Sequence, residues 1–381
     1  MTVDQNISSR INLMRMLLIA GIVFVHVPYD HDASPFLQHN DDFDWLRVFL
    51  GESLFRIGVP CLSAISGYLL FRKGMAGFDY RRTLRQKART LLLPFLLWNL
   101  SLLLAVLIIQ RAGIGIGYFP DLWNASPADW LDHALALGDF PVNLPLYFLR
   151  DLMVCILLSP VLAFLLQRVP GPTLGILFAI AVFPPLTSGV VLKQSILFSF
   201  ALGMFLALYR VDVRKLDQHA PLGVGLVLLG ALLLADPLLS GGPDYPLGLD
   251  ILRNLLAMLG AAGFWLLSAP LARTRLGRRL AESGSLSFWT FCAHYPLLML
   301  FWMVWNRYAG ADLYPVFYIG GVLLTFAVLV LSNRLVRDMC PGIYEILTGS
   351  RNRRAAPADA AASPGTKSGA GRSARLIEQQ R

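Results

Sequence analysis

The chain has 381 residues, of which 56% are hydrophobic and only 15% are charged. Soluble domains carry about 25% charged residues, so this composition excludes an ordinary soluble protein and indicates an integral membrane protein. The formal net charge of +9 follows from basic loops on one side of a membrane, so no nucleic-acid partner is expected.

Apolar segments recur along the chain, and each is close to the ~20 residues that a helix needs to cross a bilayer. The first segment carries Arg15 and lacks a small-x-small cleavage site, so we expect an uncleaved span and not a signal peptide. We predict an all-α integral membrane protein with about ten transmembrane helices, at residues 11–29, 47–71, 90–110, 146–167, 173–191, 195–210, 220–236, 250–270, 285–305 and 313–333.

Lysine and arginine gather in alternate loops of this pattern. They occupy residues 72–89, 168–172, 210–219, 271–284 and the tail, whereas residues 30–46, 112–145 and 237–249 contain none. Because basic loops stay on the inner side, we predict that the N- and C-termini are both cytoplasmic. Lys193 and Arg307 are the exceptions. The predicted domains are a multi-spanning domain at 1–340 and a basic, largely disordered tail at 341–381.

Two residues in the first span are costly in hydrocarbon, Arg15 and His26. They are eleven positions apart, so they share one helical face and lie roughly 16 Å apart along the axis. Ionisable residues inside a span commonly line a cavity or a reaction path. The alternative is an Arg15 that snorkels to the interface and an interfacial His26.

His294 lies near the middle of the ninth span and is followed by Pro296, which loosens the helix. An imidazole can serve as a general base or a proton relay. For both His26 and His294 the alternative is a packing histidine that bonds a neighbouring carbonyl.

The second span holds Glu52 and Arg56 one turn apart. The two can form a purely structural pair, or Glu52 can face His26 and orient its imidazole. In the same span Ser63, Ser66 and Gly67 have the spacing of a close helix–helix contact.

Arg82, Arg85 and Arg89 share one face of the helix that enters the third span. Such a cluster at the cytoplasmic mouth suits a polyphosphorylated ligand, although basic residues also serve topology alone. The chain has no Walker A sequence and no metal-ligand cluster, so neither ATP hydrolysis nor a metal centre is expected.

Arg150 and Asp151 enter the fourth span from outside. Adjacent helical residues do not face each other, so we expect each to find a partner elsewhere. Arg150 is a candidate for holding an acceptor substrate, with a structural ion pair as the alternative. Lys193 and Arg253 sit at outer span edges, where snorkelling accounts for them.

Taken together, these residues resemble membrane acyltransferase family 3, whose multi-spanning bacterial members move acyl groups onto glycans at the outer face. The resemblance covers the first to the ninth span and excludes the outer loops and the tail. It is carried by the Arg15–x10–His26 pair and by VPCLSAISGYLLF, RRTLRQKAR, LYFLRDLMVCILLSP and FCAHYPL.

The resemblance implies that the donor is a cytoplasmic acyl-CoA, with acetyl-CoA expected, and that the acceptor is a sugar hydroxyl. By position, Arg15, Arg82, Arg85 and Arg89 would bind the CoA. His26 would be the catalytic base or an acyl relay. From the residues alone, and not from the resemblance, we expect Glu52 to orient His26 and Arg150 and His294 to be on the substrate side. The fused periplasmic hydrolase-like domain of some members is not found, so transfer would finish within the membrane part or on a separate protein.

The sequence therefore predicts an inner-membrane O-acyltransferase that modifies an exopolysaccharide or its lipid-linked precursor, in the bilayer and alongside polysaccharide-synthesis machinery. One alternative is a transporter or flippase for a lipid-linked saccharide, although no internal repeat of the kind common in transporters is found. Another is a non-catalytic membrane subunit of the polysaccharide machinery.

Overall fold

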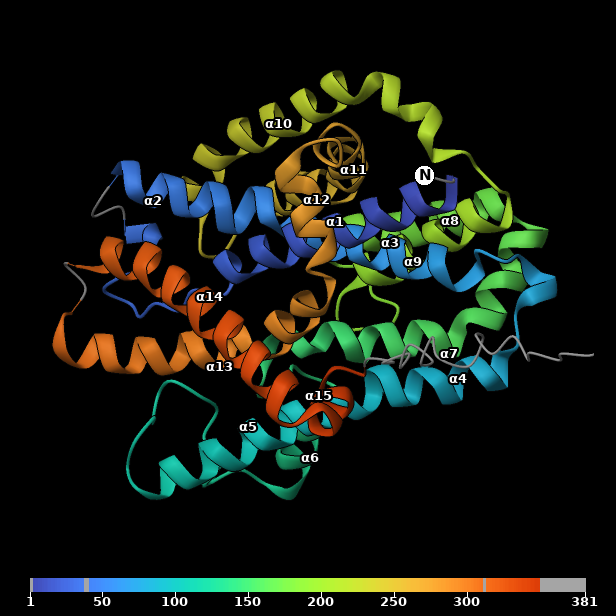
Figure 1. Cartoon of the computed structure of the whole chain (residues 1–381). Coiled ribbons are helices and arrows are strands. Elements are labelled where there is room, and N and C mark those ends of the chain that lie inside the picture. The colour runs from blue at the N-terminus through green and yellow to red at the C-terminus, as the bar shows by residue number, and fades with distance from the viewer. Residues whose placement is uncertain (1–2, 38–40, 311–312, 350–381) are drawn as a thin grey trace, which may run out of the picture. The chain divides into compact units, whose positions relative to one another are not determined.

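The computed structural model describes residues 3–37, 41–310 and 313–349, and its regular elements over these residues are helices (Figure 1). The α-helices are α1 Val3–Val25, α2 Asp41–Val48, α3 Gly58–Phe71, α4 Tyr80–Lys87, α5 Leu93–Arg111, α6 Pro127–Leu135, α7 Tyr147–Arg168, α8 Pro170–Val182, α9 Gln194–Leu208, α10 Ala220–Gly241, α11 Leu247–Leu271, α12 Arg275–Glu282, α13 Gly284–Tyr308, α14 Tyr314–Met339 and α15 Pro341–Thr348. Short 3-10 and π segments connect them: η1 Pro35–Leu37, η2 Phe49–Leu54, η3 Phe55–Ile57, η4 Met75–Gly77, η5 Ala88–Leu92, η6 Leu144–Leu146 and η7 Val213–His219.

Eight helical segments in the described part are long and apolar enough to cross a membrane, fewer than the ten predicted. The predicted fifth and sixth spans correspond to the shorter helices α8 and α9. At ~1.5 Å per residue they extend only about 20 and 22 Å, short of a ~30 Å hydrocarbon core. Pro184 and Pro185 follow the end of α8 and explain why the helix stops near Val182.

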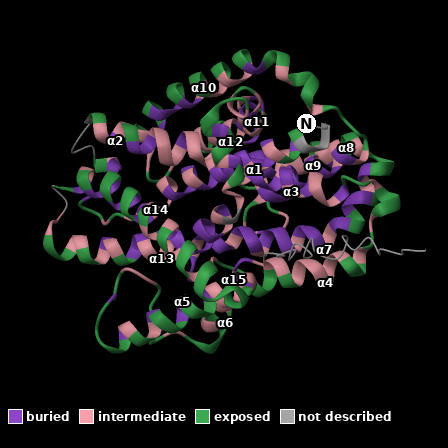
Figure 2. Cartoon of the chain, in the orientation of Figure 1, coloured by how far each residue is buried: buried purple, intermediate pink, exposed green. Residues whose placement is uncertain are grey.

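The core lies among α1, α3, α7, α9 and α13, whose buried apolar residues form one cluster. Figure 2 shows stretches of buried residues in α1, α3 and α7. The closest approach within it is between α3 and α9. A Cβ added at Gly67 would meet the backbone carbonyl of Phe200, and one at Gly203 would meet that of Ala64. For Gly67 this geometry confirms the predicted close helix–helix contact, because only a hydrogen side chain lets the two backbones come so close. Ser66 lines the Arg15 cavity instead.

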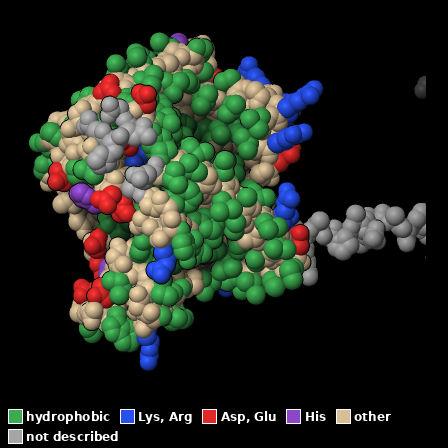
Figure 3. Space-filling model, turned by 90° about the vertical axis from the view of Figure 1, so that its left-hand side faces the viewer, with side chains coloured by type: hydrophobic (Ala, Val, Ile, Leu, Met, Phe, Trp, Pro, Cys, Tyr) green, Lys and Arg blue, Asp and Glu red, His purple; other side chains and the backbone are tan. Residues whose placement is uncertain are grey.

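Apolar side chains cover the outside of the surrounding helices. Leu104 of α5, Leu226 and Leu233 of α10, Leu259 of α11 and Leu323 of α14 are all more than half exposed. A surface of this kind suits lipid and not water. In the face shown in Figure 3, acidic side chains gather at the left, several Lys and Arg side chains project at the right edge, and hydrophobic side chains fill the zone between. A few Lys and Arg side chains also lie at the lower left, and a few acidic ones at the right edge.

The first part of the predicted tail is helical. Residues 341–348 form α15, in which the carbonyl of Leu347 accepts a hydrogen bond from the indole of Trp98 at 3.0 Å and the Tyr344 ring stacks on Trp289 at 5.8 Å. The described helical packing therefore continues past residue 340, through α15. The rest of the predicted disordered tail, from residue 350, lies outside the described residues.

Candidate active site

His26 follows the last residue of α1, and Pro28 two positions later prevents the helix from continuing. Its ring Nδ1 lies 2.9 Å from the carbonyl oxygen of Ile22, one turn back. A carbonyl oxygen only accepts, so Nδ1 carries the proton and donates it to Ile22. Nε2 of His26 therefore keeps its lone pair, which is what a general base requires.

His294 of α13 is fully buried and contacts His26 from a distant part of the chain. Its own Nδ1 bonds the carbonyl of Thr290 at 2.9 Å, which leaves Nε2 unprotonated, and this Nε2 lies 3.4 Å from Nδ1 of His26. The Nδ1–H of His26 is thus directed to acceptors on two helices. This arrangement holds the ring orientation and the tautomer of His26.

Pro296 removes one backbone hydrogen bond from α13. Because proline lacks an N–H, it cannot donate to the carbonyl of Cys292 one turn back. Instead, the side-chain amide of the buried Asn143 donates to that carbonyl at 3.1 Å. The loosened turn beside His294 is therefore stabilised by a contact from the loop that precedes α7.

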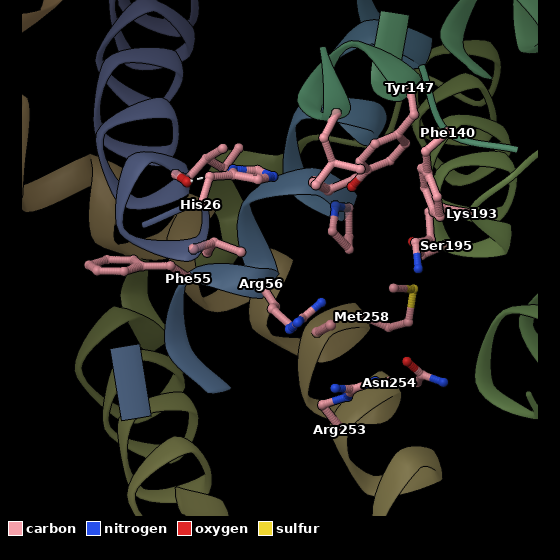
Figure 4. Close-up of a pocket in the computed structure, with 16 residues that line it drawn as sticks. His26, Phe55, Arg56, Phe140, Tyr147, Lys193, Ser195, Arg253, Asn254 and Met258 are labelled. Atoms are coloured by element: carbon pink, nitrogen blue, oxygen red, sulfur yellow. Dashed lines mark hydrogen bonds between the residues drawn. The ribbon is translucent and has the colours of Figure 1, made fainter. Parts of the chain in front are cut away.

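A cavity of about 310 Å³ opens in front of His26. Figure 4 shows the His26 ring with one nitrogen bonded back to its own helix and the other directed toward the space between the labelled side chains. Across that space lie the basic side chains of Arg56, Lys193 and Arg253, together with Tyr147. The cavity combines a base with a lone pair and a set of cations.

A second cavity of about 310 Å³ contains Arg15. Its other polar lining residues are Ser66, Thr90 and Ser287, and aromatic residues close one side. Among the residues that the structure describes, the guanidinium of Arg15 has no hydrogen-bond or ion-pair partner. A half-buried cation of this kind is available to an anionic ligand.

The two cavities lie one after the other along the same helices. Ile19 of α1 lines the Arg15 cavity and Ile22, one turn further, lines the His26 cavity. On α7, Phe148 lines the Arg15 cavity and the adjacent Tyr147 lines the His26 cavity. Arg15 and His26 therefore face two consecutive cavities. The nearest lining residues of these cavities on α1, Ile19 and Ile22, are about one helical turn apart, or ~5 Å.

The comparisons with known proteins show the family of the chain. Residues 8–334 match the model of a protein family described as "Acyltransferase domain". The chain belongs to this acyltransferase family. It is 55% identical over 349 residues to a protein named "Succinoglycan biosynthesis protein ExoH" from Rhizobium meliloti (strain 1021), covering 91% of this chain and 94% of that one. No solved structure matches. The protein is accordingly an O-acyltransferase.

In this acyltransferase Glu52 does not contact His26, so the predicted role of Glu52 in orienting the imidazole is wrong. Its Oε2 accepts from Nη2 of Arg56 at 2.6 Å and from Nη1 of Arg253 at 3.0 Å. The contacts of the His26 ring are to Ile22 and His294 instead. Glu52 holds two guanidinium groups of the cavity wall in place, which is the structural pairing with Arg56 extended by one more arginine.

The expectation that Arg150 and Asp151 each find a partner elsewhere is wrong for Arg150. Its guanidinium pairs with the adjacent Asp151 at 2.9 Å. Its other donors go to the carbonyls of Ala136, Leu137 and Val190 at 2.8–2.9 Å. Arg150 is in the first turn of α7, where its long side chain can bend past the helix end to these loops, so the rule for adjacent residues inside a helix does not apply to it. The geometry supports a structural role and not substrate binding.

The arginines of the predicted CoA cluster lie on α4 and the π segment η5. Arg82, Arg85 and Arg89 are exposed, whereas Thr90 and Leu91 of η5 line the Arg15 cavity. A π turn adds a residue to the helical turn and shifts the side chains that follow. The three arginines therefore lie on the segment that enters the cavity wall, outside the cavity itself.

The sequence did not indicate that three basic residues share the His26 cavity. They are Arg56, Lys193 and Arg253. The sequence argument assigned Lys193 and Arg253 to snorkelling, although Lys193 stood out as one of two basic exceptions on the outer side. Burial, together with the nearby Arg56 and Arg253, lowers the pKa of Lys193 from its usual value. The side chain of Lys193 lines the cavity and also remains open to solvent.

Proposed function

We propose that this acyltransferase takes an acyl group from acyl-CoA at the cytoplasmic face and transfers it to a sugar hydroxyl of a periplasmic or lipid-linked glycan. Acetyl-CoA is the expected donor, and the protein would lie in the inner membrane with both termini in the cytoplasm. The biosynthetic name of the relative from Rhizobium meliloti supports an exopolysaccharide acceptor. The two consecutive cavities along α1 support a donor and an acceptor that approach from opposite sides.

The residues around Arg15 fit the donor. Arg15 offers an unpaired guanidinium inside a cavity whose other walls are mainly apolar, and such a group binds phosphate oxygens well. Exposed Arg82, Arg85 and Arg89 add positive charge on α4 and η5, the segment that enters this cavity wall.

His26 would perform the proton transfer. Its Nε2 accepts the proton of the acceptor hydroxyl while the hydroxyl oxygen attacks the thioester carbonyl of the donor. The carbon–sulfur bond then breaks, and the proton on Nε2 passes to the departing sulfur, so that the base is restored. The observation that carries this proposal is the single lone pair of His26 directed into the cavity, with its tautomer held by Ile22 and His294.

The test is transfer in membrane vesicles of defined orientation that contain the full-length protein. With labelled acetyl-CoA supplied to the cytoplasmic face, we expect label on the glycan or lipid-linked acceptor. Supply to the opposite face should give none. The control is His26→Ala in matched vesicles. Movement of an unacylated saccharide across the bilayer without acyl transfer would instead establish a transporter and overturn the proposal.

A further inference from the structure

Three basic side chains from separate parts of the chain converge on the His26 cavity. Arg56 comes from η3, Lys193 directly precedes α9, and Arg253 comes from α11. Figure 4 shows all three with their nitrogens around the same space as His26. Neither an acetyl group nor a neutral sugar hydroxyl carries a charge that would pair with a cation left over in this cluster.

The charges of this cluster do not cancel. Glu52 accepts from Arg56 and Arg253, and Asp250 accepts from Arg253 at 2.8 Å. Three cations against two carboxylates leave one excess positive charge, on Lys193. Because Lys193 lines the cavity and is open to solvent, its charge is accessible to an anionic group that enters.

Lys193 is held so that its ammonium stays at the cavity. Asp151 accepts from the backbone N–H of Lys193 at 2.8 Å and from that of Leu192 at 3.0 Å, so the backbone is anchored. The ammonium lies 5.3 Å from the ring centre of Phe140, another lining residue. Among the described residues it has no hydrogen-bond or ion-pair partner.

We propose that Lys193, with Arg56 and Arg253, forms a subsite for a carboxylate that one of the two substrates carries near its reacting group. One excess charge matches a carboxylate better than a phosphate, which bears up to two. The carboxylate has two sources: an acidic sugar of the acceptor, or the far end of a dicarboxylic acyl group on the donor. The subsite itself does not depend on the proposed function. Only the question of which substrate carries the carboxylate rests on it.

The first experiment measures binding without catalysis. Full-length protein in lipid nanodiscs is treated with the N-hydroxysuccinimide ester of acetic acid, and modification of Lys193 is followed by mass spectrometry with the exposed Lys215 as internal control. Glucuronate is compared with glucose, and monomethyl succinate with methyl butyrate. We expect a carboxylate probe to slow modification of Lys193 several-fold, while its neutral counterpart and Lys215 show no change. Glucuronate protection identifies the acceptor, and succinate monoester protection identifies the acyl group. Protection by no carboxylate, or equal protection by neutral probes, overturns the subsite.

The second experiment uses transfer kinetics with the same pairs of substrates. Lys193→Met should raise KM for the carboxylate-bearing substrate about tenfold or more, the value of a charged hydrogen bond, and leave the neutral one unchanged. Lys193→Arg should restore most of the affinity, and the exposed outer Arg307→Gln is the matched control. An equal loss for charged and neutral substrates contradicts the subsite. Absence of transfer by the unmodified protein counts against the proposed function, whereas the labelling result decides the subsite alone.

Discussion

Nε2 of His294 lies 3.4 Å from Nδ1 of His26, although the two histidines are 268 residues apart in the chain. Each ring also bonds a carbonyl of its own helix, Ile22 for His26 and Thr290 for His294. The second histidine therefore acts through the first: it favours the proton on Nδ1 of His26 and leaves Nε2 free for the acceptor hydroxyl. His294 is a positioning residue in this account.

Substitution of His294 tests that role. In His294→Ala, the ring of His26 keeps only its bond to Ile22, so we expect kcat to fall about three- to tenfold with KM unchanged, the effect of one lost hydrogen bond. His294→Gln, which offers a side-chain oxygen as acceptor, should recover part of the loss. Steady-state transfer assays on purified protein measure both. An unchanged kcat in the alanine variant would leave His294 a packing residue.

Arg15 should matter more for donor affinity than the exposed arginines before it. Arg15→Ala removes a half-buried guanidinium, so KM for acyl-CoA should rise about tenfold or more with kcat little changed. The matched variant Arg85→Ala lies on the exposed side of α4 and should have a smaller effect that fades with added salt. A donor concentration series in vesicles compares them. A larger effect for Arg85 would move the phosphate site out to α4.

The sequence predicted the helices better than the site because their signals differ in range. Apolar length and basic loops are local, and they located the long helices, while Pro184 and Pro185 were the overlooked signal that shortened the fifth span. Helical periodicity predicted that Arg15 and His26 lie on one face of the first helix. Contacts between distant segments, such as His26 with His294 or Glu52 with Arg253, have no local signature. The pairing of Arg150 with Asp151 was missed for a different reason, because the rule for adjacent helical residues does not hold at a helix end.

Gly67 should be among the least replaceable residues of the fold. A methyl group there would collide with the carbonyl of Phe200, and backbone cannot move aside as a side chain can, so Gly67→Ala should lower stability by about 1–3 kcal/mol. Gly225→Ala of α10 is the control, since its added methyl meets open space. Thermal unfolding in detergent measures both variants. Equal midpoints would mean that α3 and α9 are not packed this tightly.

Lys193 should lose its proton more readily than an ordinary lysine. Burial and the positive charges of Arg56 and Arg253 disfavour the ammonium form, which lowers the pKa below the usual 10.5. Acylation by an amine-reactive ester, which requires the neutral amine, should therefore reach half its maximal rate below pH 10.5 at this residue. Rates at a series of pH values, read by mass spectrometry, give the midpoint. A midpoint above 10.5 would mean that nearby carboxylates such as Asp151 and Asp250 outweigh burial and the two arginines.

The most direct test of the central claim is mass spectrometry of cell-surface glycan from cells that carry His26→Ala as the only form of the protein. Loss of a general base costs on the order of 10²–10⁴ in rate. We therefore expect the acyl mass to disappear from the glycan while the variant remains in the membrane at its normal level. Glycan acylated to the normal extent in that strain would show that His26 is not the catalytic base.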